Sequence, residues 1–505
     1  MTGFQRQARH NGGRVRTPTQ IVAIHRWLGV VLCLFMAAWF ASGAVLMYVP
    51  FPALPAAERF ARAGDVDVSA VSVTPAEAIR AIGSSPPITS VRLVDRLGRP
   101  LYVLQPRGSA VSAVWADDGS PAPLQSQEDI RRVAEHFAGA KVNRIDGPLD
   151  FDQWIVHQGF DSGRPYFRVQ MDDDAGTVLY VCVRSGEVLQ RTRRVERAWN
   201  YVGAVVHWIY PTVLRRNWAA WDQVVWWLSL AGISVVVIGI WLGIDRTAIA
   251  LRRRKTQISL FRGWMKWHHV LGLCAFVFVF SWIFSGWLSM DHGRIFSMPD
   301  PTAEQVDRFR GMALVDAAEH VGLEFMRTLP AFRELDIKAV AATPLAIVRS
   351  DDGRRVYTVN SEPSYVGDSV PLPLIKVAVE NAWPGSAVRH FGVVPGDDRY
   401  RQVRQSRLSE STVRAQLDDP RSTWVHVDAN SAEIDSVMDR SRRVYRWLYH
   451  GLHSLDFPAL VNRRPLWDVI MLSLLTLGFS FSVTGAVLGI RRLMRSVRSS
   501  RAVAS

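Results

Sequence analysis

The chain has 505 residues, 48% of them hydrophobic, and a formal net charge of +14 at pH 7. The positive charge does not indicate a nucleic-acid-binding protein, because the excess arginine and lysine lie in short segments beside apolar stretches. The cysteines Cys33, Cys182 and Cys274 are too few for a disulfide framework, and packing is the better interpretation of all three.

Four nearly charge-free segments are long enough to cross a bilayer, which takes about 20 apolar residues. They cover roughly residues 24–49, 219–244, 270–290 and 466–490. The first is too long for a signal peptide and has no small-residue cleavage site after it, so we expect a retained helix. The predicted fold class is an α-helical membrane protein, a four-helix transmembrane bundle that carries two long insertions.

The basic residues beside these segments predict the topology. They are concentrated before the first segment, in the short link between the second and third, and after the fourth. By the positive-inside rule, both termini and that link are cytoplasmic. The two insertions, about residues 51–196 and 291–440, then lie outside.

Each insertion has the pattern of a small α+β domain. In the first, residues 74–82 have a capped helix start with Pro75 in the first turn, and residues 178–183 alternate as a strand does. Neither insertion has a nucleophile with a base, a phosphate-binding glycine loop or a CxxC, and no GxGxxG follows a strand. The sequence therefore gives no sign of a flavin or nicotinamide site of its own. The helix-like and strand-like stretches of the second insertion are residues 311–322, 356–359 and 424–427.

An aromatic, basic stretch precedes the second and the fourth apolar segment, at residues 197–211 and 443–458. Tryptophan and tyrosine beside arginine suit the headgroup layer, so we expect helices along the outer interface. In chain order the predicted parts are a cytoplasmic tail (1–20), a transmembrane helix (21–50), an outer domain (51–196), an interfacial helix (197–218), a transmembrane helix (219–245), a cytoplasmic basic loop (246–263), a transmembrane helix (264–290), a second outer domain (291–440), an interfacial helix (441–464), a transmembrane helix (465–490) and a cytoplasmic tail (491–505).

Two parts of the sequence occur twice, and histidines recur in both. His25 opens the first apolar segment and His268 opens the third, 243 residues later, each with a Leu-Gly pair shortly after it. His207 and His453 precede the second and fourth segments and lie 246 residues apart. Other residues around His207 recur around His453 at the same spacing of 246. The sequence therefore predicts an internal tandem duplication, with one histidine at each of two equivalent places in each half.

The four repeated histidines predict two haem sites. We expect His25 and His268 at the cytoplasmic ends of their helices and His207 and His453 at the outer ends, where pseudo-twofold symmetry brings each pair face to face. Facing histidines within a helical bundle are what bis-histidine haem ligation requires. A zinc site needs three or four protein ligands, and no carboxylate or thiolate accompanies either pair. We predict two haem b, one ligated by each pair; the alternative for any one histidine is an amphipathic residue in the headgroup layer.

Two further histidines, His269 and His450, lie next to or one helical turn from a predicted ligand but have no counterpart in the repeat. Either one is a substitute for its neighbour or, together with Arg26 or Arg446, a hydrogen-bond donor to a haem propionate.

Two repeated glycine motifs predict close helix packing: Gly239 with Gly243, and Gly485 with Gly489. The repeated Asp222 and Asp468 near the outer ends are expected at helix starts or in salt bridges, and His292 at the surface.

At these residues the chain resembles the PepSY-associated transmembrane family, often labelled iron-regulated or PiuB-like membrane proteins. The resemblance covers essentially the whole chain. It implies four helices, two external PepSY-like domains, a place in the bacterial inner membrane and a role in iron acquisition. Some members of the family look like ferric-siderophore reductases that carry b-type haems, and the fused members have a cytoplasmic reductase domain that this chain lacks. The matching pieces are His25-Arg26-Trp27-Leu28-Gly29, Thr74-Pro75-Ala76-Glu77-Ala78, His453-Ser454-Leu455-Asp456-Phe457 and Leu488-Gly489-Ile490.

We therefore expect an electron-transfer protein, an oxidoreductase that takes electrons from quinol or a cytoplasmic reductase and reduces a ferric siderophore or another ferric chelate outside. Reduction of Fe(III) weakens its binding to hard oxygen donors. A bilayer core of about 30 Å separates the outermost histidine positions, so the histidines must dip inward. The alternatives are a PepSY protein that binds a ligand or regulates a peptidase without redox activity, and a small transporter for siderophore or metal. Against the transporter, the helices carry no acidic residue at mid-depth.

Overall fold

The computed structural model of the protein describes residues 19–83, 85–253, 256–296, 301–360, 362–401 and 408–504. The predicted N-terminal tail, residues 1–20, lies almost wholly outside the described residues. The chain divides into two units. The helical unit comprises Met1–Ala41, Trp227–Phe284 and Leu472–Ser505, and the sheet unit comprises Ser42–Trp226 and Ser285–Met471.

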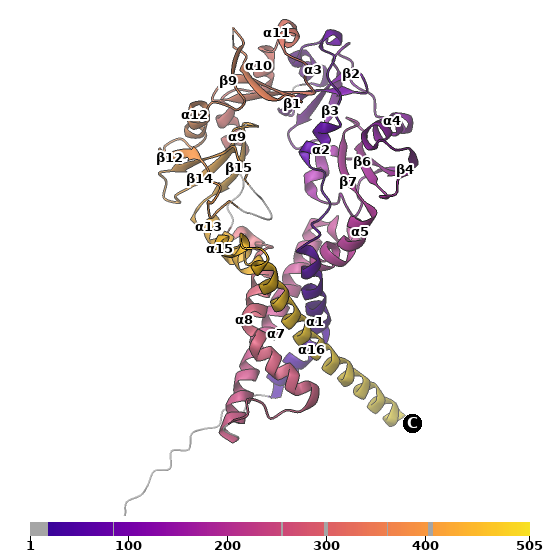
Figure 1. Ribbon diagram of the computed structural model, residues 1–505, viewed down its shortest axis with the longest axis vertical. Coiled ribbons are helices and arrows are strands. Elements are labelled where there is room, and N and C mark those ends of the chain that lie inside the picture. The colour runs from indigo at the N-terminus through magenta and orange to yellow at the C-terminus, as the bar shows by residue number, and fades with distance from the viewer. Residues whose placement is uncertain are drawn as a thin grey trace, which may run out of the picture. The chain divides into compact units, whose positions relative to one another are not determined.

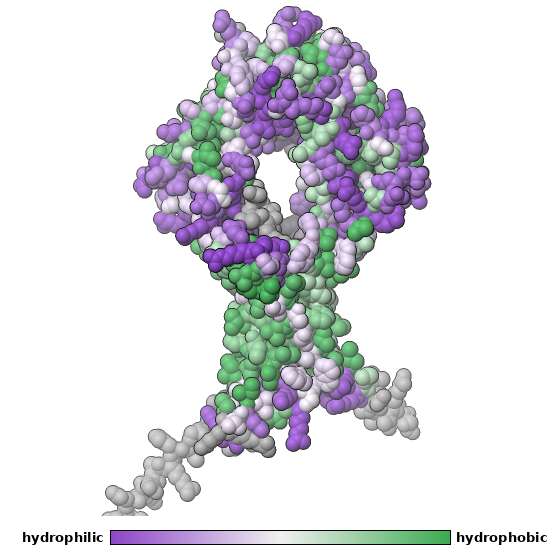
Figure 2. All heavy atoms as spheres, in the orientation of Figure 1, coloured by the Kyte–Doolittle hydropathy of each residue, from purple (hydrophilic) through white to green (hydrophobic). Residues whose placement is uncertain are grey.

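Four long helices are long and apolar enough to cross a membrane: α1 (Thr19–Leu46), α7 (Trp218–Arg253), α8 (Gly263–Leu288) and α16 (Leu466–Ala504). Figure 2 shows that hydrophobic residues gather over these helices, whereas hydrophilic residues dominate the visible face of the sheet unit. The four predicted segments are therefore all found as apolar helices.

The helix ends differ from the prediction. Residues expected in the basic loop, 246–263, begin as the last turns of α7, and the tail expected at 491–505 continues α16. The helical parts, residues 246–253 and 491–504, consist of alanine, leucine, arginine and other residues compatible with a helix, with no glycine or proline to stop it. The first helix ends at Leu46, shortly before Pro50, rather than at residue 50.

The two insertions are joined by one antiparallel sheet of seven strands, in the order β11-β10-β9-β8-β1-β2-β3. Figure 1 labels β9 of the second insertion and β1, β2 and β3 of the first in this part of the molecule. The first insertion contributes β1 (Ile88–Arg96), β2 (Arg99–Pro106) and β3 (Ser112–Trp115), and the second contributes β8 (Glu334–Val340), β9 (Thr343–Ser350), β10 (Gly353–Thr358) and β11 (Ser364–Gly367).

The prediction of two separate outer domains, 51–196 and 291–440, therefore needs correction. Strand β1 pairs with β8, with Val91 opposite Ile337, and one hydrophobic core takes buried residues from both insertions. All seven residues of β8 are buried. Left apart, the halves would expose apolar edge strands, which proteins avoid because such edges recruit other chains. The junction removes both edges.

Each insertion also contributes a four-stranded antiparallel sheet of its own. One has the order β4-β5-β6-β7, and the other has the order β12-β13-β14-β15. A helix packs on each: α4 (Gln127–Ala138) on the first and α12 (Leu372–Ala382) on the second. The strands are β4 (Val142–Leu149), β5 (Tyr166–Met171), β6 (Val178–Cys182), β7 (Val188–Thr192), β12 (Val388–Val393), β13 (Thr412–Leu417), β14 (Trp424–Asp428) and β15 (Glu433–Met438).

The local predictions within the insertions mostly hold. Helix α3 (Pro75–Ile82) begins after Thr74, which forms a capping box with Glu77, as its sequence predicts. The expected strands correspond to β6, β10 and β14, and the stretch 311–322 is helical only over α10 (Leu314–Glu319). The remaining short helices are α2 (Ala56–Ala61), η1 (Val68–Ala70), η2 (Gln158–Gly163), η4 (His292–Arg294), α9 (Ala303–Arg310) and α11 (Leu323–Thr328).

The predicted interfacial helices, 197–218 and 441–464, are broken into short pieces. Each starts as an α-helix, continues as a π-helix and then turns at a residue with positive φ, Ile209 in one and Leu455 in the other. These turning residues lie at equivalent places in the repeat. Single π-turns within helices often mark functional sites. The pieces are α5 (Arg194–Asn200), η3 (Tyr201–Val205) and α6 (Thr212–Arg215), and α13 (Arg440–Arg446), η5 (Trp447–Gly451), α14 (Leu452–Ser454) and α15 (Pro458–Val461).

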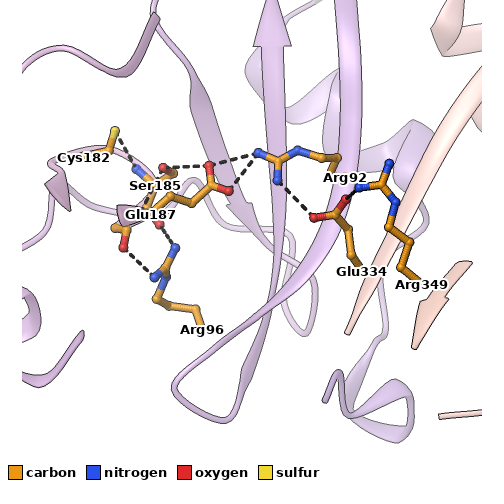
Figure 3. Close-up of polar contacts among 8 residues, drawn as sticks. Arg92, Arg96, Cys182, Ser185, Glu187, Glu334 and Arg349 are labelled. Carbon is orange, nitrogen blue, oxygen red and sulfur yellow. Dashed lines mark hydrogen bonds and ion pairs between the residues drawn. The ribbon is translucent and has the colours of Figure 1, made fainter. Parts of the chain in front are cut away.

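A network of charged side chains ties the shared sheet to the turn between β6 and β7 (Figure 3). Arg92 on β1 lies 2.9 Å from the carboxylate of Glu187 and 3.4 Å from that of Glu334 on β8. Arg349 also contacts Glu334, at 3.1 Å, and Arg96 donates to the backbone carbonyl of Gly186 at 2.6 Å. These side chains are largely buried, so the network holds three segments of the sheet unit together.

Candidate functional site

His25 on α1 and His268 on α8, here called the first histidine pair, face each other in the helical unit. Their ring centres lie 6.5 Å apart, and the ring planes are inclined by 48°. An imidazole nitrogen binds a transition metal at about 2.0–2.1 Å, so two imidazoles on opposite sides of one ion have ring centres roughly 6 Å apart. The first pair therefore has the separation of two axial ligands.

The tautomer of His25 is fixed by its hydrogen bond to α7. Its Nδ1 lies 3.1 Å from the backbone oxygen of Val235. A carbonyl oxygen only accepts, so Nδ1 carries the proton and donates it. In the neutral ring, Nε2 then has the free lone pair that a metal needs.

The tautomer of His268 is fixed by two consecutive hydrogen bonds through Thr484. Its Nδ1 lies 3.1 Å from the hydroxyl oxygen of Thr484 on α16. That hydroxyl donates its one proton to the backbone oxygen of Phe481, at 2.6 Å. The Thr484 oxygen must therefore accept from His268, which leaves Nε2 unprotonated as in His25. No hydrogen bond to Nε2 of either histidine is found among the residues that the structure describes.

Glycines of α7 and α16 make room for the two rings. A Cβ atom at Gly239 would lie 2.8 Å from Cε1 of His25, and one at Gly485 would lie 3.3 Å from Cε1 of His268. The second glycine of each motif behaves as predicted: Gly243 packs against Leu273 and Gly489 against Val30. The packing prediction is thus correct for the second glycines, and the first glycines each accommodate a histidine ring.

A cavity of about 820 Å³ contains the first pair and reaches residues of all four long helices. Its volume is within the usual range for cofactor sites, about 300–1,000 Å³. Glycines of every long helix line it, so a flat ring system can approach the backbone: Gly29, Gly239, Gly272 and Gly485. Phe276 and Phe481 contribute aromatic surface.

Six arginines also line this cavity: Arg26, Arg246, Arg262, Arg491, Arg492 and Arg495. Among the described residues of the lining there is no aspartate or glutamate. Guanidinium groups bind carboxylates and phosphates in a forked geometry, so the cavity favours an anionic ligand. Two imidazoles that face each other, glycine walls and arginines for the propionates together fit a haem.

His207 and His453, here called the second histidine pair, lie in the sheet unit. Their ring centres are 6.0 Å apart and their planes are inclined by 72°. Nδ1 of His207 is hydrogen-bonded to the hydroxyl of Ser42 at 3.0 Å, and Nδ1 of His453 to that of Ser285 at 3.1 Å. Both serines are buried, at 1% and 0% exposure. The second pair thus repeats the spacing of the first, with Nδ1 held by a neighbouring helix.

The two auxiliary histidines have different surroundings. Both ring nitrogens of the buried His269 are hydrogen-bonded, Nδ1 to the hydroxyl of Ser259 at 2.9 Å and Nε2 to the backbone oxygen of Gly243 at 3.0 Å. This geometry favours His268 over His269 as a ligand, since His269 would have to break both bonds. The rings of His450 and Tyr449 pack with their centres 4.5 Å apart. Burial, and next the charge of Arg446, lowers the pKa of His450 to about 4. A neutral His450 remains a candidate for the second site.

Arg446 is buried at 1% exposure on α13 and lies 3.4 Å from the carboxylate of Asp456. Its Nε donates to the backbone oxygen of Arg399, and its guanidinium lies over the ring of Trp447. Nη2 is the atom in the ion pair with Asp456, whereas Nη1 has no hydrogen-bond partner within the described residues. Nη1 is therefore compatible with the predicted role toward a propionate.

The other titratable residues singled out by the sequence lie where expected. Nδ1 of the half-exposed His292 lies 2.8 Å from the carboxylate of Asp222. Asp468, in the first turn of α16, forms an ion pair with Arg464, which lies just before that helix, and accepts a hydrogen bond from Tyr48. These are the salt-bridging roles predicted for the two aspartates. Among the described residues, no group of three or more histidine, cysteine, aspartate or glutamate side chains is placed to hold a metal ion alone.

A family model described as a PepSY-associated TM region matches residues 22–492. The chain belongs to the PepSY-associated transmembrane family. No curated protein matches it. The resemblance inferred from the sequence is thus confirmed, as is a membrane protein with α+β soluble parts.

In this PepSY-associated chain the sequence located all four paired histidines but not every residue around them. Ser42 and Ser285 recur at equivalent places in the repeat. That recurrence was the signal for their role, which is a hydrogen bond to Nδ1 of His207 and of His453. At the positions that correspond to Thr484 and Phe481 the first half has different residue types, Ile238 and Val235, so the repeat gave no signal for their roles.

The glycine that accommodates His25 offers a first test within this PepSY-associated chain. If the first pair ligates a haem, Gly239→Ala is expected to lower haem affinity there by roughly tenfold, because the new methyl group would force the His25 ring aside. Haem titration of the haem-free protein measures this. Gly243→Ala is the matched control one turn along α7. Its Cβ would lie 3.3 Å from the flexible Leu273 side chain and 4.0 Å from the His269 ring, an ordinary contact distance, so its effect should be smaller. Equal affinities in the two variants would contradict the assigned role of Gly239.

Proposed function

We propose that this protein is a di-haem b electron carrier of the bacterial inner membrane that reduces a ferric chelate, most simply a ferric siderophore, on the outer side. Both termini and the basic link would be cytoplasmic and both insertions periplasmic. The observation that carries the proposal is the repeated histidine geometry. Two pairs have ring centres 6.5 and 6.0 Å apart, and Nδ1 of every ring is held by a hydrogen bond.

Haem held by two imidazoles supplies a one-electron carrier whose potential depends on its ligands and their hydrogen bonds. The chain's own residues would do the rest. His25 and His268 would hold one haem, and His207 and His453 the other. Arginines of the cavity lining, Arg26 among them, would bind propionates of the first haem, and Arg446 would do so at the second.

Equivalent elements in the two halves support an origin by internal duplication. The π-helices Tyr201–Val205 and Trp447–Gly451 and the turning residues Ile209 and Leu455 keep the 246-residue spacing of the sequence repeat. Duplication explains why both histidine pairs combine one residue from each half. The proposal also places the chain in the iron-regulated, PiuB-like branch of the family that its sequence resembles.

The proposal assigns the electron donor to the first histidine pair and the electron acceptor to the second. The arginine-lined cavity with the first pair would face the donor, either a quinol or a cytoplasmic reductase. The sheet unit with the second pair would face the ferric chelate. Reduction would release the iron, because Fe(II) binds hard oxygen donors more weakly than Fe(III) does.

The test is a dithionite-reduced minus oxidised spectrum of the detergent-purified full chain, with a pyridine haemochrome assay for stoichiometry. We expect sharp b-type bands and two haems per chain. A colourless protein from haem-replete cells would overturn the proposal and leave a PepSY-type ligand binder or a transporter as the function.

A further inference from the structure

The two members of the first histidine pair are held differently, although they occupy equivalent places in the two halves. In the 246-residue frame of the repeat, Phe481 corresponds to Val235 and Thr484 to Ile238. Nδ1 of His25 donates directly to the carbonyl oxygen of Val235. At the equivalent carbonyl, that of Phe481, the hydroxyl of Thr484 is interposed and receives the proton of His268 instead.

Thr484 is well suited to be a fixed acceptor. It is only 4% exposed, so water does not compete for its hydroxyl. Its own proton is committed to Phe481 at 2.6 Å, and a hydroxyl that donates to a carbonyl becomes a better acceptor. The alternative tautomer of His268, with the proton on Nε2, would lose its bond to Thr484 because that hydroxyl has no second proton to give.

One turn of α16 contacts the His268 ring on three sides. Thr484 holds Nδ1, and Phe481 stacks on the ring face with ring centres 4.9 Å apart and planes inclined by 21°. Gly485 lies against the edge at Cε1, where a Cβ would come within 3.3 Å. The ring is therefore fixed in position and in tautomer, with Nε2 as its remaining polar atom.

We propose that Thr484 is a positioning residue for the first haem: it keeps His268 in the Nδ1–H tautomer and sets the donor strength of Nε2 toward the iron. The inference rests on the proposed function, because it presupposes that His268 is a haem ligand. Hydrogen-bond acceptors behind a ligating histidine raise its basicity and orient its ring, and their loss typically costs about 10–100-fold in affinity. The two histidines that would hold this haem are thus inequivalent, with a hydroxyl behind His268 and a carbonyl behind His25.

The test compares three variants of the full chain. Thr484→Val keeps the shape but removes the acceptor, and Thr484→Ser keeps a hydroxyl. Ile238→Val makes a small change at the position of α7 that corresponds to Thr484 in the repeat. We expect Thr484→Val to lower haem affinity at the first site about 10–100-fold and to raise its midpoint potential, since a less basic ligand stabilises Fe(III) less. Thr484→Ser should recover both properties, and Ile238→Val should match the wild type.

A haem-free readout separates this inference from the proposed function. In haem-free protein with 15N-labelled histidine, NMR should show His268 in a single Nδ1–H tautomer, and Thr484→Val should yield a tautomer mixture. If Thr484→Val and Ile238→Val have the same haem affinity, midpoint potential and tautomer signal, the role of Thr484 is refuted while haem binding stands. If His268→Ala keeps both haems, His268 is not a ligand and this inference falls while haem binding stands; a colourless wild-type chain would instead overturn the proposed function itself.

Discussion

Replacing His268 by alanine is expected to remove one haem of two and leave the other with its bis-histidine spectrum. His25→Ala should remove the same haem, because the rings of both residues face each other at 6.5 Å. His207→Ala and His453→Ala should each remove the second haem, since their rings lie 6.0 Å apart. Haem stoichiometry and low-spin signals in electron paramagnetic resonance spectra measure these losses.

Double variants test the pairing itself. Two substitutions within one pair should cost no more haem than either alone, because in the proposed function both histidines of a pair would hold one iron. One substitution in each pair should remove both haems. His269→Ala is the matched control beside His268, since both of its ring nitrogens are already hydrogen-bonded to Ser259 and Gly243. Loss of haem in His269→Ala but not in His268→Ala would refute the ligand assignment.

Arg92→Ala is expected to destabilise the sheet unit by about 3–5 kcal/mol, the usual cost of removing one partner from a buried ion pair. The substitution leaves Glu187 and Glu334 without the guanidinium that lies 2.9 and 3.4 Å from them, at side-chain exposures of 16% and 11%. Chemical denaturation of the full chain measures the loss in free energy of unfolding, and hydrogen exchange of the amides in β1 and β8 shows where it occurs. Arg80→Ala is the control: its ion pair with Glu319 is 57% and 55% exposed, so its loss should change stability by less than about 1 kcal/mol.

The same variant has a predicted pH dependence. Burial alone would raise the pKa of Glu187, but the charges of Arg92, Arg59 and Arg96 outweigh it and hold that pKa below its ordinary value. The carboxylate therefore stabilises the fold above its unfolded pKa of about 4.3, and this contribution is lost as the pH falls. Without Arg92 a protonated Glu187 is easier to bury than a charged one. The stability difference between wild type and Arg92→Ala should narrow between pH 7 and pH 4, and a constant difference would contradict the role of this ion pair.

The sequence predicted those parts of the fold and site that depend on local pattern or on the repeat. Apolar length identified α1, α7, α8 and α16, and the recurrence of His25 and His268 identified a pair before any contact was known. Pairing of β1 with β8 was missed because it joins residues far apart in the sequence, and alternation along a strand does not say which strand lies beside it. Thr484 was missed because its role depends on a hydrogen bond that only the packed helices create.

The junction of β1 and β8 also has a consequence for how the protein is made. The register places Val91 opposite Ile337, so the centre of the shared sheet has to wait for residues that leave the ribosome long after β1. Until β8 arrives, β1 has one unpaired edge, and such an edge is where a nascent chain is most prone to mispairing. A chain arrested before Glu334 should therefore be sensitive to protease near β1 and become resistant once synthesis passes Val340. The joining of the two halves therefore exposes the chain to mispairing during synthesis, and this exposure ends once β8 has paired with β1.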